Sequence, residues 1–153
     1  RIFSFFNRDT GTHNFQSDKA IESITSGGYF GKGIGEGTLK NRVPEAHTDY
    51  IISVISEEFG VVAIMLILLL FLMFIYMVFK KINYEKDDKT KLVLIGCVSL
   101  ILMQATIHVG VNIRLFPTTG MTLPFLSYGG SSIVSISILS GIILNLTKRK
   151  IEN

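Results

Sequence analysis

Three side chains capable of acid–base chemistry lie close together ahead of a long apolar run: Glu45, His47 and Asp49, in the segment PEAHTD. A carboxylate placed like Asp49 can act as a general base, with His47 or Glu45 orienting it or sharing a metal ion. A structural role is the alternative, because an aspartate at a helix start caps free backbone N–H groups and is held ionised by the helix dipole. Spacing alone leaves both interpretations open.

The glycine-dense segment GGYFGKGIGEG at residues 27–37 is a second candidate. Successive backbone N–H groups in such a loop can bind a phosphate. However, the segment lacks the preceding strand and the following helix of a nucleotide-binding loop. A turn that lets backbones approach closely is therefore the alternative.

A third polar group interrupts an apolar stretch: Gln104, His108 and Asn112 are spaced four residues apart. This spacing puts them on one helix face. Such a stripe either lines a functional cavity or makes interhelical hydrogen bonds of about 1 kcal/mol each.

Other hydrolytic chemistries lack their patterns. His47 belongs to no HExxH or paired-cysteine motif, and the serines of residues 125–132 form no GxSxG elbow. We assign no metal ligands, and we interpret the single cysteine, Cys97, as a small packing residue.

Three long uncharged segments must position these groups. Each is free of Asp, Glu, Lys and Arg over about 20 residues, enough for a helix to cross about 30 Å of hydrocarbon. The sequence therefore predicts an all-α integral membrane protein with three transmembrane helices. We place the helices at 49–80, 92–111 and 124–147, the loops at 81–91 and 112–123, and the ends at 1–48 and 148–153.

The net charge of +3 is concentrated at one side of these spans, which argues against nucleic acid as a partner. Lysines crowd the loop 81–91, and Lys148, Arg149 and Lys150 follow the last span. By the positive-inside rule, this loop and the C-terminus are cytoplasmic, whereas residues 1–48 and 112–123 are extracytoplasmic. A large extracytoplasmic segment needs an upstream span, so we expect the chain to be part of a longer protein.

The first span is expected to be a single helix over residues 49–79, about 45 Å long, with its first turns outside the membrane. Thr48 or Asp49 is the expected N-cap, since Pro44 disfavours helix just before. A shorter amphipathic helix is expected over residues 16–26.

The motifs at residues 27–37, 44–60 (PEAHTDYIISVISEEFG) and 109–132 (VGVNIRLFPTTGMTLPFLSYGGSS) resemble the SEDS family of shape, elongation, division and sporulation proteins. PEAHTD and TGMTLP are more similar to the FtsW division type than to the RodA elongation type. The resemblance implies a bundle of about ten apolar spans. This chain would supply the last three and the large outer loop before them.

The resemblance also implies an activity: a peptidoglycan glycosyltransferase that polymerises lipid II into glycan strands on the outer face of the bacterial cytoplasmic membrane. Its implied partners are lipid II, undecaprenyl-linked glycan, a class B penicillin-binding protein and other membrane proteins of division or elongation. Asp49 matches the family's essential aspartate, with Glu45 and His47 in supporting roles. Cavity-shaping or lipid-contacting roles are implied for Lys32, Ser127, Gly129 and Gly130, and we add Gln104 and His108 as candidate contacts.

The mechanism expected from this resemblance is glycosyl transfer with inversion. Asp49 takes the proton from the 4-hydroxyl of lipid II, which attacks the lipid-linked sugar and displaces undecaprenyl pyrophosphate. Lys32, Arg42 or a divalent cation, Mg or Mn, would stabilise the leaving group. A lipid II flippase and a non-catalytic scaffold are the alternatives. We expect this chain alone to be inactive, because three helices cannot enclose a cavity built by about ten.

Overall fold

The computed structural model describes residues 12–38, 42–43 and 46–148, which contain four α-helices and no strand. Three helices are long and apolar enough to cross a membrane. The all-α membrane fold with three candidate spans is therefore confirmed. The helices are α2 (Thr12–Gly27), α4 (Ile51–Tyr84), α5 (Asp88–Asn112) and α6 (Gly130–Thr147).

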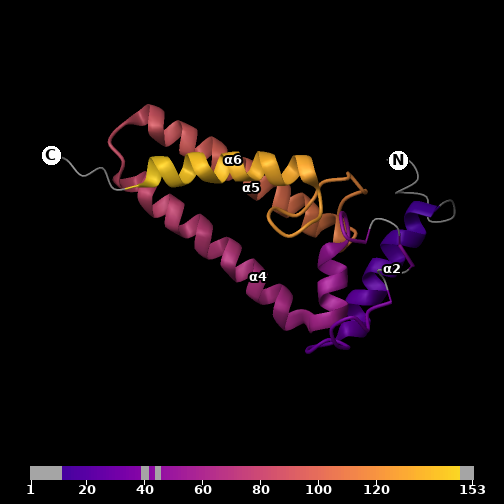
Figure 1. The fold of residues 1–153 in the computed structure, drawn as a ribbon. Coiled ribbons are helices and arrows are strands. Elements are labelled where there is room, and N and C mark those ends of the chain that lie inside the picture. The colour runs from indigo at the N-terminus through magenta and orange to yellow at the C-terminus, as the bar shows by residue number, and fades with distance from the viewer. Residues whose placement is uncertain (1–11, 39–41, 44–45, 149–153) are drawn as a thin grey trace.

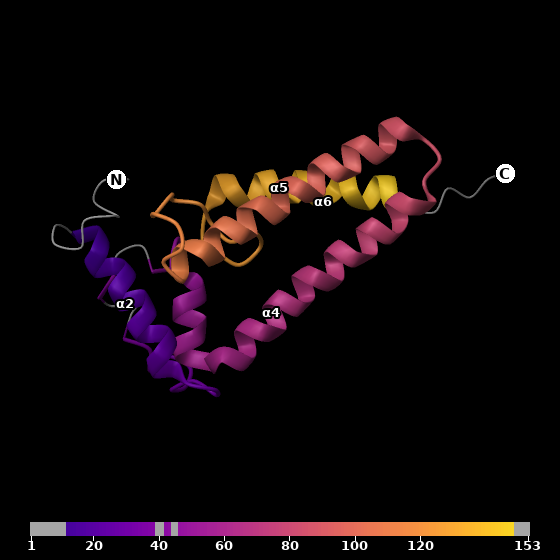
Figure 2. The same ribbon diagram turned by 180° about the vertical axis from the view of Figure 1, so that it is seen from behind.

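The helices are arranged so that the candidate polar motifs lie at one end of the molecule. α5 and α6 run side by side, and α4 meets them at both of its ends while its bend lies away from them (Figures 1 and 2). α2, the start of α4 and the segment 113–129 gather at one end, and the α4–α5 link and the end of α6 lie at the other (Figure 1). The candidate polar motifs thus share one end.

α4 is not the single uninterrupted helix expected over residues 49–79. Gly60 has φ 81° and ψ 178°, so two helical segments meet there at a bend. Tyr50 occupies the N-cap position and its side chain makes no cap hydrogen bond. Thr48 and Asp49, the expected caps, precede that position.

The other helix bounds also differ from the expected spans for local reasons. α5 begins at Asp88 because the Asp87 carboxylate accepts hydrogen bonds from the backbone N–H groups of Lys89 and Thr90. α6 begins only at Gly130, six residues after the expected start at 124. Phe125 has φ 66°, in the left-handed region, so the chain turns before the helix can start.

Two separate apolar cores hold the ends of α4. At the end with the α4–α5 link, the core joins α4, α5 and α6, with Val78, Leu94 and Ile136 among its buried members. At the other end, Tyr50 and Val54 pack with side chains from α2 and α5, including Ala20 and Val111. The middle of α4 belongs to neither core.

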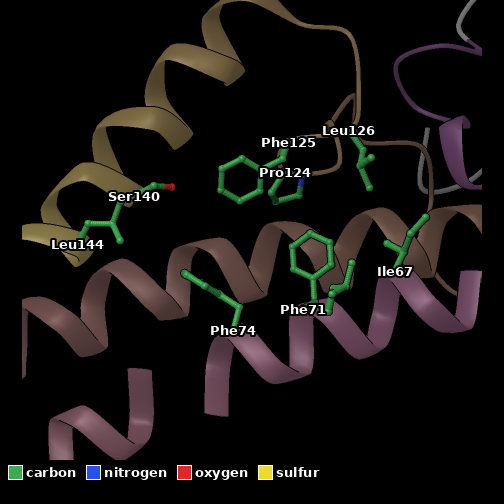
Figure 3. A pocket seen from close by; sticks show the side chains of 9 residues that line it. Ile67, Phe71, Phe74, Pro124, Phe125, Leu126, Ser140 and Leu144 are labelled. Atoms are coloured by element: carbon green, nitrogen blue, oxygen red, sulfur yellow. The ribbon is translucent and has the colours of Figure 1, made fainter. Parts of the chain in front are cut away.

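Apolar cavities lie between α4 and the elements that it faces. One has a volume of about 380 Å³ and lies between Phe71 and Phe74 of α4, Pro124 and Phe125 of the loop, and Leu144 of α6 (Figure 3). Another, of about 510 Å³, lies between α4 and α5. Lipid or further membrane helices cover apolar surface of this kind.

Candidate active site

The glycine-dense segment is bound to the bend in α4. In an unbroken helix the N–H groups of Val61 and Val62 would bond the carbonyls of Glu57 and Glu58. The break at Gly60 separates these partners, and the loop satisfies all four groups. The bonds are Lys32 N–Glu57 O (2.8 Å), Gly33 N–Glu58 O (3.1 Å), Val61 N–Gly28 O (3.0 Å) and Val62 N–Tyr29 O (3.4 Å).

Glycine is required here because the two backbones nearly touch. A Cβ on Gly31 would lie 2.2 Å from the Glu58 carbonyl oxygen, and one on Gly60 would lie 2.2 Å from that of Tyr29. Of the two interpretations of the segment, close backbone approach fits the structure. Its N–H groups at residues 32 and 33 bond carbonyl oxygens of α4.

A buried ion pair lies beside this junction. The Glu57 side chain is 1% exposed and accepts hydrogen bonds from Lys32 Nζ (3.0 Å) and Thr38 Oγ1 (3.1 Å). The Lys32 side chain is 37% exposed, so this partner of the pair is partly open to solvent.

The pair lines a small polar pocket that also contains Arg42. The two basic residues expected to contact phosphate, Lys32 and Arg42, are thus brought together. Lys19 and Glu22, from α2, form another ion pair at its wall, and the Lys19 hydrogen bond lowers the pKa of the Glu22 carboxyl.

The HTD motif is held through its backbone. The carbonyl of His47 accepts from the backbone N–H of Tyr128 at 3.1 Å. The carbonyl of Thr48 accepts from Ser127 Oγ at 2.8 Å and from His108 Nε2 at 3.3 Å. Because a carbonyl only accepts, His108 carries its proton on Nε2 in this contact. Two elements, α5 and the loop before α6, therefore fix the chain just ahead of Asp49.

The third carbonyl of the motif, that of Asp49, accepts from Asn112 Nδ2 at 2.9 Å. The Asp49 residue is 7% exposed, whereas His47 is exposed. Asp49 and the Lys32–Glu57 pair are separated by roughly two turns of the first segment of α4. Glu45 lies outside the described residues.

Gln104, the first residue of the polar stripe, joins α5 to the loop before α6 and to α6 itself. Its Nε2 donates to the Thr122 carbonyl at 2.8 Å and lies 3.3 Å from Ser132 Oγ. Gln104, His108 and Asn112 thus all make contacts between elements, as the hydrogen-bonding interpretation of the stripe requires.

The two candidate glycines at the start of α6 differ. A Cβ on Gly129 would lie 3.2 Å from Thr122 Cγ2, whereas one on Gly130 would meet nothing within 4 Å. Gly129 is the N-cap residue of α6, and Gly130 is the first residue of that helix.

The described residues offer no group of three His, Cys, Asp or Glu side chains that could hold a metal ion. Because Mg²⁺ can be held by one or two carboxylates together with substrate phosphates, a divalent cation at this site stays a prediction, and no catalytic step is assigned to one.

Sequence reasoning missed three features of this region: the break at Gly60, the Lys32–Glu57 pair, and the hydrogen bonds that Asn112 Oδ1 accepts from the N–H (3.2 Å) and hydroxyl (2.8 Å) of Ser53. The one available signal was Gly60 itself, a glycine within an expected helix two residues after the pair Glu57 and Glu58.

Comparison with known proteins decides the family. The family model FTSW_RODA_SPOVE, described as "Cell cycle protein", matches residues 1–152. The chain belongs to the FtsW/RodA/SpoVE family. The resemblance inferred from the three motifs is thereby confirmed.

Curated FtsW/RodA/SpoVE relatives share more than a third of the aligned residues. The chain is 38% identical over 139 residues to "Probable peptidoglycan glycosyltransferase FtsW" of Enterococcus hirae, covering 90% of this chain and 35% of the relative. It is 38% identical over 151 residues to the protein of the same name in Caulobacter vibrioides, covering 98% and 38%. For "Stage V sporulation protein E" of Bacillus subtilis the identity is 37%, covering 97% and 41%.

A solved structure has the same fold. It is a chain of a structure described as "Structural coordination of polymerization and crosslinking by a peptidoglycan synthase complex", with a TM-score of 0.73 and 26% identity. The match covers 96% of this chain and 40% of that chain. The FtsW/RodA/SpoVE chain described here thus spans about two fifths of the length of these relatives.

Proposed function

We propose that this chain is the catalytic C-terminal part of a longer peptidoglycan glycosyltransferase that polymerises lipid II. One observation carries the proposal: a nearly buried carboxylate, Asp49, lies in a backbone segment held by both α5 and the loop before α6. A general base needs such fixed placement, because small displacements of a reacting group cost large factors in rate.

The proposed reaction forms one glycosidic bond and breaks one bond to phosphate. Asp49 takes the proton of the 4-hydroxyl of the acceptor lipid II, and that oxygen attacks the anomeric carbon of the lipid-linked glycan. The bond from this carbon to the phosphate oxygen breaks with inversion, and its electron pair leaves with undecaprenyl pyrophosphate.

The basic pocket suits the departing anion. Lys32 uses one of its three donors on Glu57, which leaves donors for a ligand, and Arg42 lines the same pocket. We propose that these two side chains contribute positive charge to the leaving pyrophosphate, together with groups from the rest of the protein.

We also propose the surroundings of the protein. The chain spans the bacterial cytoplasmic membrane with its C-terminus and the lysines of residues 80–91 inside. The α4–α5 link and the end of α6 lie at the same end of the molecule, which supports this orientation (Figure 1). A crosslinking class B penicillin-binding protein is the proposed partner, supported by the match to a synthase complex that couples polymerization and crosslinking. The relatives named FtsW and Stage V sporulation protein E favour a division-type role.

The test is Asp49→Asn in the full-length protein, reconstituted with its partner and given lipid II. We expect the rate of glycan polymerisation to fall by at least about 100-fold, because the asparagine amide has nearly the shape of the carboxylate but cannot act as a base. Asp87→Asn is the matched control, since asparagine also caps helices and Asp87 lies at the opposite end. Polymerisation by Asp49→Asn near the parental rate would overturn the proposal, and lipid II transfer between leaflets without polymer would favour the flippase.

A further inference from the structure

Asn112 is completely buried, and its side-chain amide is fully engaged. Its Oδ1 accepts from the backbone N–H of Ser53 at 3.2 Å and from Ser53 Oγ at 2.8 Å. Its Nδ2 donates to the carbonyls of Asp49 and His108, each at 2.9 Å. A primary amide has two donors and two acceptor lone pairs, so these four bonds use its whole capacity. Asn112 therefore has no hydrogen-bonding group left for a substrate.

The bonds to Ser53 and Asp49 lie on either side of the start of α4. Ser53 is the third residue of the helix, and its N–H is among those that no intrahelical carbonyl can satisfy. An N-cap side chain normally accepts from the second or third N–H of its own helix. Tyr50 makes no such bond, and Asn112 of α5 accepts from the third N–H instead.

We propose that Asn112 caps α4 from the neighbouring helix and is a positioning residue for the chemistry of Asp49. It joins the carbonyl of Asp49 to the third N–H of α4 through one rigid planar group. The backbone that carries the carboxylate is thereby clamped over the N-terminal turn of α4. The inference rests on the proposed polymerase function.

If Asn112 positions Asp49, weakening its hydrogen bonds should change kcat and leave KM unchanged. A residue that only aims the base changes the rate of the chemical step and leaves substrate binding intact. Asn112→Asp keeps the shape and the acceptor toward Ser53, but it replaces the donor toward the Asp49 carbonyl by a second acceptor. We expect kcat to fall about 10- to 100-fold, with KM for lipid II within about twofold of the parent.

The experiment measures lipid II polymerisation by the full-length protein with its partner, using Asn112→Asp, Ser53→Ala and the double variant. Ser53→Ala removes only the hydroxyl bond and should lower kcat about threefold, again without a change in KM. Because both act through one clamp, the double variant should be no slower than Asn112→Asp alone. Asn83→Ala, an exposed asparagine at the opposite end of α4, is the control expected to retain parental kcat.

The outcomes separate the two proposals. Parental kcat in Asn112→Asp, or a raised KM with unchanged kcat, overturns the positioning role even when Asp49→Asn is inactive. Polymerisation by Asp49→Asn overturns the function itself. If Asn112→Asp does not accumulate in the membrane, Ser53→Ala decides alone: a lower kcat at constant KM supports the clamp, and parental kinetics overturn it.

Discussion

The two ends of the first segment of α4 are held by different chemistry. At Asp49, the neighbouring helix and loop reach the backbone with side chains: Ser127, His108 and Asn112. At Gly60, the four hydrogen bonds that bridge the break in the helix join backbone groups of α4 and of the loop at residues 28–33. A backbone junction depends on the absence of side chains, whereas a side-chain junction depends on particular atoms being present. Adding a side chain should therefore destabilise the Gly60 end, whereas removing side-chain atoms should destabilise the Asp49 end.

The largest effect is expected when a side chain is added at the backbone junction. Gly60→Val would place a Cβ 2.2 Å from the Tyr29 carbonyl oxygen on a residue with φ 81°. We expect a loss of about 3 kcal/mol or more in folding stability, from strain and from displacing the loop. Thermal unfolding of the detergent-purified full-length protein measures it.

Gly141→Ala is the matched control for that change. Nothing lies within 4 Å of a Cβ on Gly141, which is in the interior of α6. Alanine there should be neutral or slightly stabilising, because it favours helix over glycine. Equal unfolding temperatures for Gly60→Val and the parent would show that the loop does not hold the bend.

An intermediate effect is expected at the ion pair beside the backbone junction. Lys32→Met removes the ammonium partner of the buried Glu57 carboxylate, which keeps the hydrogen bond from the Thr38 hydroxyl, and because Lys32 is partly exposed solvent screens the pair. The expected loss of stability is about 1–2 kcal/mol. Lys91→Met, which breaks the more exposed Lys91–Asp88 pair, should cost about 0.5 kcal/mol or less.

The same residue also tests the proposed pyrophosphate contact. Glu57→Gln releases the Lys32 ammonium without removing it, so polymerisation should survive in that variant and fall in Lys32→Met. Equal losses of activity would mean that the pair matters only as a structural unit.

The smallest effect is expected when one hydroxyl group is removed at the Asp49 end. Ser127→Ala removes the bond to the Thr48 carbonyl, which keeps His108, and leaves the Leu123 N–H without its hydroxyl partner. We expect about 1 kcal/mol of lost stability and a few-fold lower kcat. In Ser135→Ala, which loses only a bond within its own helix, both quantities should match the parent.

Sequence patterns predicted what depends on composition and short spacing. The apolar segments predicted three membrane helices, and the PEAHTD motif pointed to Asp49. The bend at Gly60 could not be predicted, because a glycine costs a helix only about 1 kcal/mol and does not by itself signal a break. The hydrogen bonds that stabilise the bend come from a loop about thirty residues upstream. Helical periodicity carries no information about such long-range backbone pairing.

The partners of the polar stripe escaped prediction for a related reason. The four-residue spacing correctly grouped Gln104, His108 and Asn112 on one face, but it carries no information about what that face meets. Asn112 and Ser53 are 59 residues apart in the chain, and only the packing of α5 against α4 brings them together.

The charge balance of the small polar pocket limits how strongly it can attract an anion. Among the described residues, three cationic and two anionic side chains line it, which leaves one net positive charge from these residues: Lys19, Lys32 and Arg42 against Glu22 and Glu57. From these side chains, a pyrophosphate ester arriving there would meet the field of one net positive charge, which physiological salt screens within about 8 Å. Attraction at a distance would thus be weak, and ligand selection in this pocket would rest on short-range geometry.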